Sequence, residues 1–170
     1  MQTLSRILRQ IALALLSGGS TAIVFAAITL VKAATAKGIP VAEAAATNSP
    51  VFIQYSKVAF AAAVVLAVGE LIGFLKGANK TKLDYAQLVF SLGCIGAVCV
   101  FAFGIVPPME QLLPSLNTVE QAKQQFHDLH KISEKVFGAS ILFAYISLIL
   151  PAFKRESLAL SQKPKETAVV

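Results

Sequence analysis

Long runs of apolar residues, separated by shorter polar segments, dominate this sequence. The first run covers residues 11–31, which are 21 residues without a charged side chain. At about 1.5 Å of rise per helical residue, a run of this length crosses the roughly 30 Å hydrocarbon layer of a bilayer. Further runs of the same character follow, and the predicted spans are about 11–32, 57–75, 85–106 and 134–151.

These runs predict an all-α protein, an integral membrane bundle of four transmembrane helices. The membrane domain is expected to cover residues 11–153. A basic N-terminal segment, residues 1–10, precedes it, and a polar tail, residues 154–170, follows it. The composition of the tail is typical of a disordered segment.

Helix-breaking residues punctuate the segment between the first two spans. Gly38, Pro40 and Pro50 interrupt an alanine-rich stretch. Within it, residues 41–46 favour a short helix that lies on the membrane surface, separate from the second span.

Prolines also mark the ends of the third and fourth spans. Pro107 and Pro108 predict a sharp stop, because proline lacks an amide proton and clashes with the preceding helical turn. The fourth span is expected to continue a helix that begins near Thr118, and to end at Pro151.

The composition agrees with this membrane assignment. Hydrophobic residues make up 56% of the chain and charged residues only 14%, against about 25% in soluble domains. The net charge of +6 does not indicate a nucleic-acid partner, since no basic arm interleaved with aromatic residues is present. The expected surroundings are therefore the lipid bilayer and other membrane proteins or further copies of the chain.

A cleaved signal peptide is an alternative interpretation of the first run. Arg6 and Arg9 precede it, and residues 34–36 resemble a cleavage site. However, the run is longer than the roughly 7–15 apolar residues of a signal peptide, which favours a retained membrane helix.

The distribution of lysine and arginine predicts the orientation. With four spans, the N-terminus, the second loop and the tail share one side of the membrane. That side carries the larger number of basic residues: Arg6, Arg9, Lys76, Lys80, Lys82, Lys154, Arg155, Lys163 and Lys165. The other side carries fewer, in longer loops: Lys32, Lys37, Lys57, Lys123, Lys131 and Lys135. The side with the termini thus has nine basic residues and the other side six, so the positive-inside rule predicts that both termini lie in the cytoplasm. A bacterial inner membrane is expected, or a thylakoid membrane if the source is phototrophic.

Glu70 is the only acidic residue within an apolar span. Gly69, Gly73 and Gly77 recur at every fourth position around it, which is the spacing of a helix-packing face. A carboxylate here indicates either a proton- or cation-handling group between helices, or a side chain that leans toward the headgroups near Lys76. In the first span, Gly18 and Gly19 predict a second packing face.

A polar segment before the fourth span holds both histidines. On a helix, His127, His130 and Glu134 share one face, and with Glu110 or Glu120 they form a weak candidate for a metal site. The alternative is a solvated helical turn at the membrane edge. No catalytic set of residues occurs, so neither an enzyme nor a bound cofactor is expected.

One element of this segment resembles a known family. Phe126, Leu129, His130 and Ser133 form the pattern Phe-x-x-Leu-His-x-x-Ser at the start of the fourth span, and Pro107 closes the third. The pattern resembles the small four-helix membrane proteins of unknown function that are related to eukaryotic transmembrane protein 205. The resemblance implies four spans and marks His130 and Ser133 as characteristic polar residues, but it implies no reaction.

The sequence is compatible with three functions. The first is a non-enzymatic scaffold or assembly factor that binds membrane complexes through its glycine-lined helix faces. The second is a small oligomeric transporter or channel that uses Glu70. The third is a metal- or redox-linked membrane protein around His127 and His130. We favour the first.

Overall fold

The computed structural model describes residues 2–76, 81–116 and 118–161, and all regular structure within these ranges is helical. The elements are α1 (Gln2–Ala14), η1 (Leu15–Gly19), α2 (Ser20–Thr35), α3 (Val41–Lys76), α4 (Lys82–Cys99), η2 (Val100–Ile105), α5 (Val106–Leu112), η3 (Leu113–Ser115) and α6 (Glu120–Ser161). Here η1 and η2 are π-helical turns and η3 is a 3₁₀ turn.

Consecutive elements join into helices long enough to cross a membrane. Within the described residues four segments are sufficiently long and apolar: Thr3–Thr35, Glu43–Leu75, Lys82–Ser115 and Glu120–Phe153. Each predicted span falls inside one of them. The prediction of an all-α chain with four membrane-length helices is therefore confirmed.

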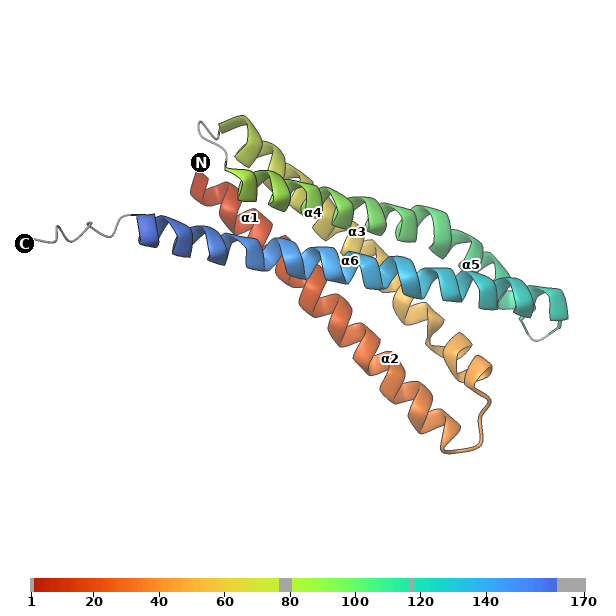
Figure 1. Cartoon of the computed structure of the whole chain (residues 1–170). Coiled ribbons are helices and arrows are strands. Elements are labelled where there is room, and N and C mark those ends of the chain that lie inside the picture. Colours follow the sequence, from red (N-terminus) through yellow and green to blue (C-terminus); the bar gives the residue numbers. More distant parts are fainter. Residues whose placement is uncertain (1, 77–80, 117, 162–170) are drawn as a thin grey trace, which may run out of the picture.

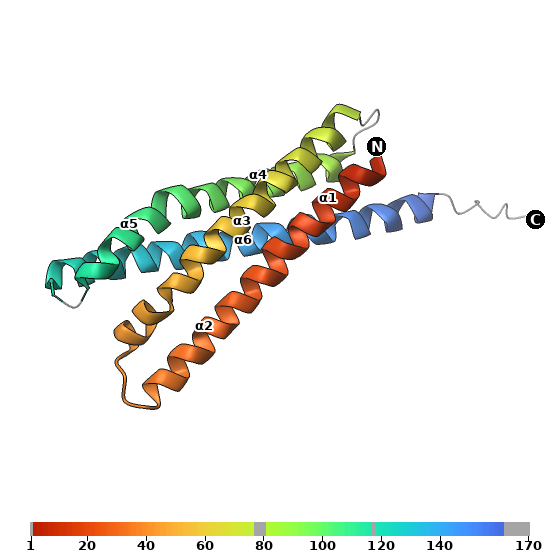
Figure 2. The ribbon, with the colours of Figure 1, turned by 180° about the vertical axis from the view of Figure 1, so that it is seen from behind.

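The helices form two pairs that meet at one end and diverge at the other (Figures 1 and 2). The starts of α1 and α4, the end of α3 and the second half of α6 lie at the closed end, beyond which the last turns of α6 project (Figure 1). Toward the open end, α2 and the beginning of α3 separate from α5 and the beginning of α6, which both views show.

An aromatic cluster lies in the middle of the bundle core. Phe137 of α6 packs edge-on against Phe52 and Tyr55 of α3, with ring centroids 6.1 Å apart in both cases. It also contacts Phe101 of η2 at 4.9 Å. These rings connect α3 of one helix pair with α6 and η2 of the other.

The prediction of a separate surface helix at residues 41–46 is wrong. These residues are the first turns of α3, which continues through Pro50. A proline inside a membrane helix is tolerated when neighbouring groups satisfy the carbonyls that it disturbs. Pro50 removes the amide donor of the Ala46 carbonyl, four residues back, and the Ser49 hydroxyl adds a donor to the neighbouring Ala45 carbonyl at 3.2 Å.

The predicted stop at Pro107 and Pro108 is also wrong. The π-helical turn η2 precedes them, and the amide of Val106 donates to the carbonyl of Phe101, five residues back. The prolines then occupy the first turn of α5, where a helix needs no amide donors. The helix consequently continues to Ser115 through η3.

The fourth helix is longer than the sequence predicts. α6 passes through Pro151 and reaches Ser161, so the prediction of a disordered tail is wrong for residues 154–161. Residues 162–170 of the predicted tail lie outside the described residues. In the predicted N-terminal segment 1–10, α1 begins at Gln2 and is continuous with the first membrane helix.

Candidate functional site

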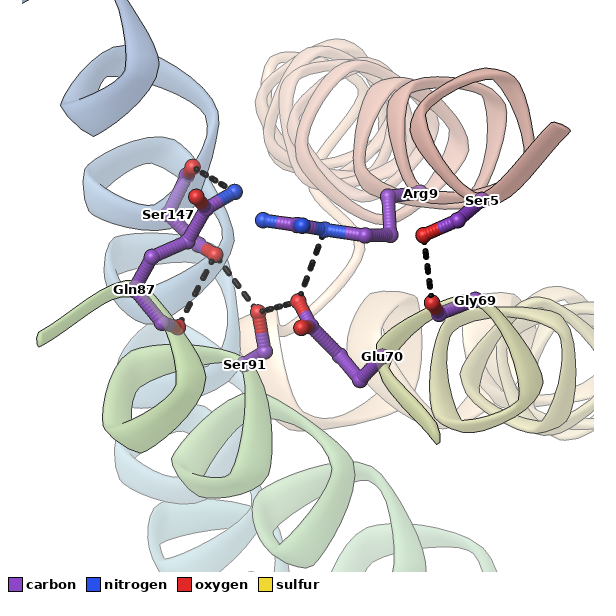
Figure 3. Close-up of polar contacts among 7 residues, drawn as sticks. All are labelled: Ser5, Arg9, Gly69, Glu70, Gln87, Ser91 and Ser147. Atoms are coloured by element: carbon purple, nitrogen blue, oxygen red, sulfur yellow. Dashed lines mark hydrogen bonds and ion pairs between the residues drawn. The ribbon is translucent and has the colours of Figure 1, made fainter. Parts of the chain in front are cut away.

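Glu70 is buried between helices and is paired with an arginine. Only 6% of the residue is exposed. Nε of Arg9, on α1, lies 3.0 Å from Oε1 of Glu70, and the hydroxyl of Ser91, on α4, donates to the same oxygen at 2.7 Å. The sequence left open whether Glu70 leans toward the headgroups, and the structure places it inside the bundle instead (Figure 3).

Hydrogen bonds continue this contact to the fourth membrane helix. The hydroxyls of Ser91 and Ser147, on α6, lie 2.6 Å apart. Because Ser91 donates its only proton to Glu70, Ser147 donates in this contact, and its hydroxyl also lies 3.4 Å from the Gln87 carbonyl. The Gln87 amide donates to the Ser147 carbonyl at 3.3 Å. Glu70, Ser91 and Ser147 thus form one connected chain across α3, α4 and α6 (Figure 3).

Two glycines of α3 allow α1 to come close enough for the ion pair. A Cβ on Gly69 would lie 2.9 Å from Cγ and 3.2 Å from the backbone nitrogen of Arg9, and one on Gly73 would lie 2.8 Å from Oγ of Ser5. The Ser5 hydroxyl also donates to the Gly69 carbonyl at 2.8 Å. The predicted packing face on the second span therefore contacts α1, while Gly77 lies outside the described residues.

We refer to Ser5, Arg9, Gly69, Glu70, Gln87, Ser91 and Ser147 as the polar cluster. It lies at the closed end of the bundle and joins all four membrane helices (Figures 1 and 3). A buried carboxylate without a partner is costly in a membrane, and a guanidinium beside it offsets that cost. The Arg9 and Glu70 side chains are 18% and 8% exposed, so solvent screens the pair only weakly.

Arg9 acts on Glu70 chiefly through its charge. Among the described residues, its buried Nε makes no hydrogen bond of normal geometry, despite the 3.0 Å separation from Oε1. The hydrogen bond that Glu70 does accept comes from Ser91. Removing the arginine therefore takes away the compensating charge and leaves the hydrogen bond.

The sequence identified Glu70 but not its partners. In the sequence alone, Arg9 is a charge that flanks the first span, although the topology of four spans also brings it near Glu70. Antiparallel neighbours bring the start of the first span beside the end of the second, where Glu70 lies. Serines and a glutamine within apolar spans carry no comparable signal, so Ser91, Ser147 and Gln87 were not found.

The histidine segment lies at the open end, away from the polar cluster. Nε2 of His130 is 3.3 Å from Oε1 of Glu134, and the His130 ring stacks on buried Phe126 with centroids 6.3 Å apart. The Ser133 hydroxyl donates to the His130 carbonyl at 2.7 Å, while His127 is exposed. In the described part of the chain, no three His, Cys, Asp or Glu side chains are grouped so that they could hold a metal ion.

The two glycines of the first span have different surroundings. A Cβ on Gly19 would lie 2.8 Å from the Tyr55 hydroxyl, so this glycine admits a side chain from α3. Gly18 is exposed, and a Cβ there would meet no atom within 4 Å. Only Gly19 is therefore used for packing inside the bundle.

No family model matches the chain, and neither a curated protein nor a solved structure shows significant similarity to it. The relation to the transmembrane protein 205 family therefore stays a prediction from the residues around His130.

Proposed function

We propose that the chain is a non-enzymatic integral membrane protein that assembles with other membrane helices, as a scaffold or assembly factor. Its interior polar groups support a structural role, because they bind one another across the bundle. The contacts of Arg9, Glu70 and Ser91 hold the protein's own helices together. A surface for partners must therefore be sought on the outside.

The outward face of the first membrane helix carries the proposal. Ala14, Gly18, Ala22 and Ala26 follow one another at intervals of four residues, and all are exposed. We call this row the outer stripe. Small residues at this spacing let a second helix approach closely, which increases packing contacts and is a recurrent basis of helix association in lipid.

This proposal changes the surface that the sequence suggested. Gly19, Gly69 and Gly73 already contact Tyr55, Arg9 and Ser5 within the chain. Gly18 alone among the predicted packing glycines with a described environment faces open space. Partners would therefore meet the first helix and not the glycines of α3.

We further propose that both termini face the cytoplasm of a bacterial inner membrane, or the corresponding side of a thylakoid membrane. The basic residues support this orientation even after Arg9 is set aside as the partner of Glu70. Without Arg9, eight lysine and arginine residues lie on the side of the termini, against six on the other side.

The experiment is co-purification from native membranes in a gentle detergent, with identification of the associated chains. The Gly18→Leu variant should fill the outer stripe and weaken association by about 1.4 kcal/mol. Recovery of partners, or of a second tagged copy, should then fall by about tenfold. Gly96→Leu is the matched control, because Gly96 is also exposed with open space beside it but lies on α4. Recovery of the chain alone, or equal losses in both variants, would contradict the proposal.

A transporter or channel is the second candidate, favoured by the burial of a carboxylate between helices. However, the Glu70 carboxylate is paired with Arg9. This pairing favours a structural role, because a carboxylate that transports cations must be free to bind and release them. Ion flux into liposomes should therefore be the same for the parent and for Glu70→Gln. A flux that the parent supports and the variant loses would establish the transporter instead.

A further inference from the structure

The first membrane helix contains a π-helical turn, Leu15–Gly19, between α1 and α2. At its end the amide of Ser20 donates to the carbonyl of Ser17, outside the regular α-helical pattern. A π-turn holds one residue more than an α-helical turn, and it displaces carbonyls from their usual donors. In lipid such carbonyls need other donors, since no water is available.

Tyr55 of α3 supplies a donor to this turn. Its hydroxyl donates to the Leu15 carbonyl at 3.0 Å and lies 3.1 Å from Oγ of Ser20. The missing side chain of Gly19 makes room, because a Cβ there would be 2.8 Å from the hydroxyl. The tyrosine hydroxyl thus lies against the turn, between the Leu15 carbonyl, the Ser20 hydroxyl and Gly19.

The segments on either side of the turn are held very differently. α1 is fixed to α3 by the hydrogen bond of Ser5 with Gly69 and by the pair of Arg9 with Glu70. Along α2, Ser20 is the only fully buried residue. α2 packs chiefly against α3 and runs into the open end of the bundle (Figures 1 and 2).

We propose that the Tyr55 hydroxyl is a latch that holds α2 in one of two rotational registers. When the hydroxyl is withdrawn, the π-turn relaxes to an α-helix and releases its extra residue. Because α1 stays fixed, α2 turns forward by one residue, about 100° around its axis. Every position of α2 then faces the direction that its C-terminal neighbour faces now. Such a turn is a discrete two-state element of the kind that conformational switches use.

A nitroxide scan of residues 21–30 in bilayers tests the latch, with Cys94 and Cys99 replaced by alanine. Accessibility to dissolved oxygen should be lowest at positions 23, 24 and 27, which the bundle half-covers. In Tyr55→Phe we expect the minima to move by one position, to 22, 23 and 26. Gly19→Ala should give the same shift, because the added methyl group displaces the hydroxyl.

Two controls separate a switch from a loss of structure. Tyr145→Phe removes a hydroxyl that lies 3.2 Å from Thr21 Oγ1, whereas the Thr21 hydroxyl keeps its own bond to the Ser17 carbonyl at 2.7 Å, so the minima should stay in place. A second scan over residues 141–144 and 146–149 of α6, which leaves out Tyr145 because it contacts α2, should be unchanged in every variant. Minima that remain at 23, 24 and 27 in both Tyr55→Phe and Gly19→Ala would overturn the proposal. So would the loss of all minima in α2 with an intact α6 profile, because the turn would then melt and not switch.

Discussion

At the scale of single residues, the polar cluster shows how a charge is tolerated inside a small membrane bundle. Glu70 has a guanidinium at 3.0 Å and a serine hydroxyl at 2.7 Å. The charge of Arg9 is fixed by sequence, but its proximity depends on the absence of a Cβ at Gly69. The glycine and the ion pair are therefore parts of one arrangement.

Gly69→Ala tests this dependence. The new methyl group would lie 2.9 Å from Arg9 Cγ, so α1 must shift away and the free energy of unfolding should fall by about 1–3 kcal/mol. The measurement is denaturation in detergent followed by circular dichroism. Gly96→Ala is the control, with open space at Cβ, and should be neutral or stabilise by up to about 1 kcal/mol through helix propensity. Equal effects in the two variants would contradict the close approach.

At the scale of elements, hydrophobic runs were sufficient to predict the four membrane-length helices. They were not sufficient to predict the helix ends, because the chain compensates its prolines locally. The π-turn η2 precedes Pro107 and Pro108, so that these prolines lie in the first turn of α5. Such compensation depends on backbone geometry that a pattern of polar and apolar positions does not encode.

Gly38 ends α2 through backbone geometry that the sequence does suggest. It is the only described residue with positive φ, at 84°, and the amide of Ile39 donates back to the Ala34 carbonyl at 3.2 Å. This is the pattern of a Schellman cap. Gly38→Ala should lower the free energy of unfolding by about 1–2 kcal/mol, because an alanine is strained at positive φ. Unchanged stability in thermal denaturation would show that the cap does not hold α2.

At the scale of the whole molecule, the closed and open ends have different roles. The polar cluster fastens the four helices at the closed end, whereas the Tyr55 latch and the histidine segment lie further along the bundle. The sequence predicted the number of helices and the residue Glu70. It did not reveal the contacts between helices, because four antiparallel apolar helices can be rotated in many ways with the same hydropathy.

Cysteine labelling tests the proposed topology. In a chain with Cys94 and Cys99 replaced by alanine, a cysteine at Lys37 should react with a membrane-impermeant maleimide added to intact cells. A cysteine at Thr3 should react only after the cells are opened, because the N-terminus is expected in the cytoplasm. The opposite pattern would reverse the orientation.

The most direct test of the account is a double-mutant cycle between Arg9 and Glu70 in reversible unfolding. Each single variant, Arg9→Gln or Glu70→Gln, leaves one buried charge uncompensated. Each should therefore lower the free energy of unfolding by about 3–5 kcal/mol. The double variant removes both charges and should lose clearly less than the sum of the two. Additive losses would mean that the charges do not stabilise one another, and would contradict a bundle fastened by this pair.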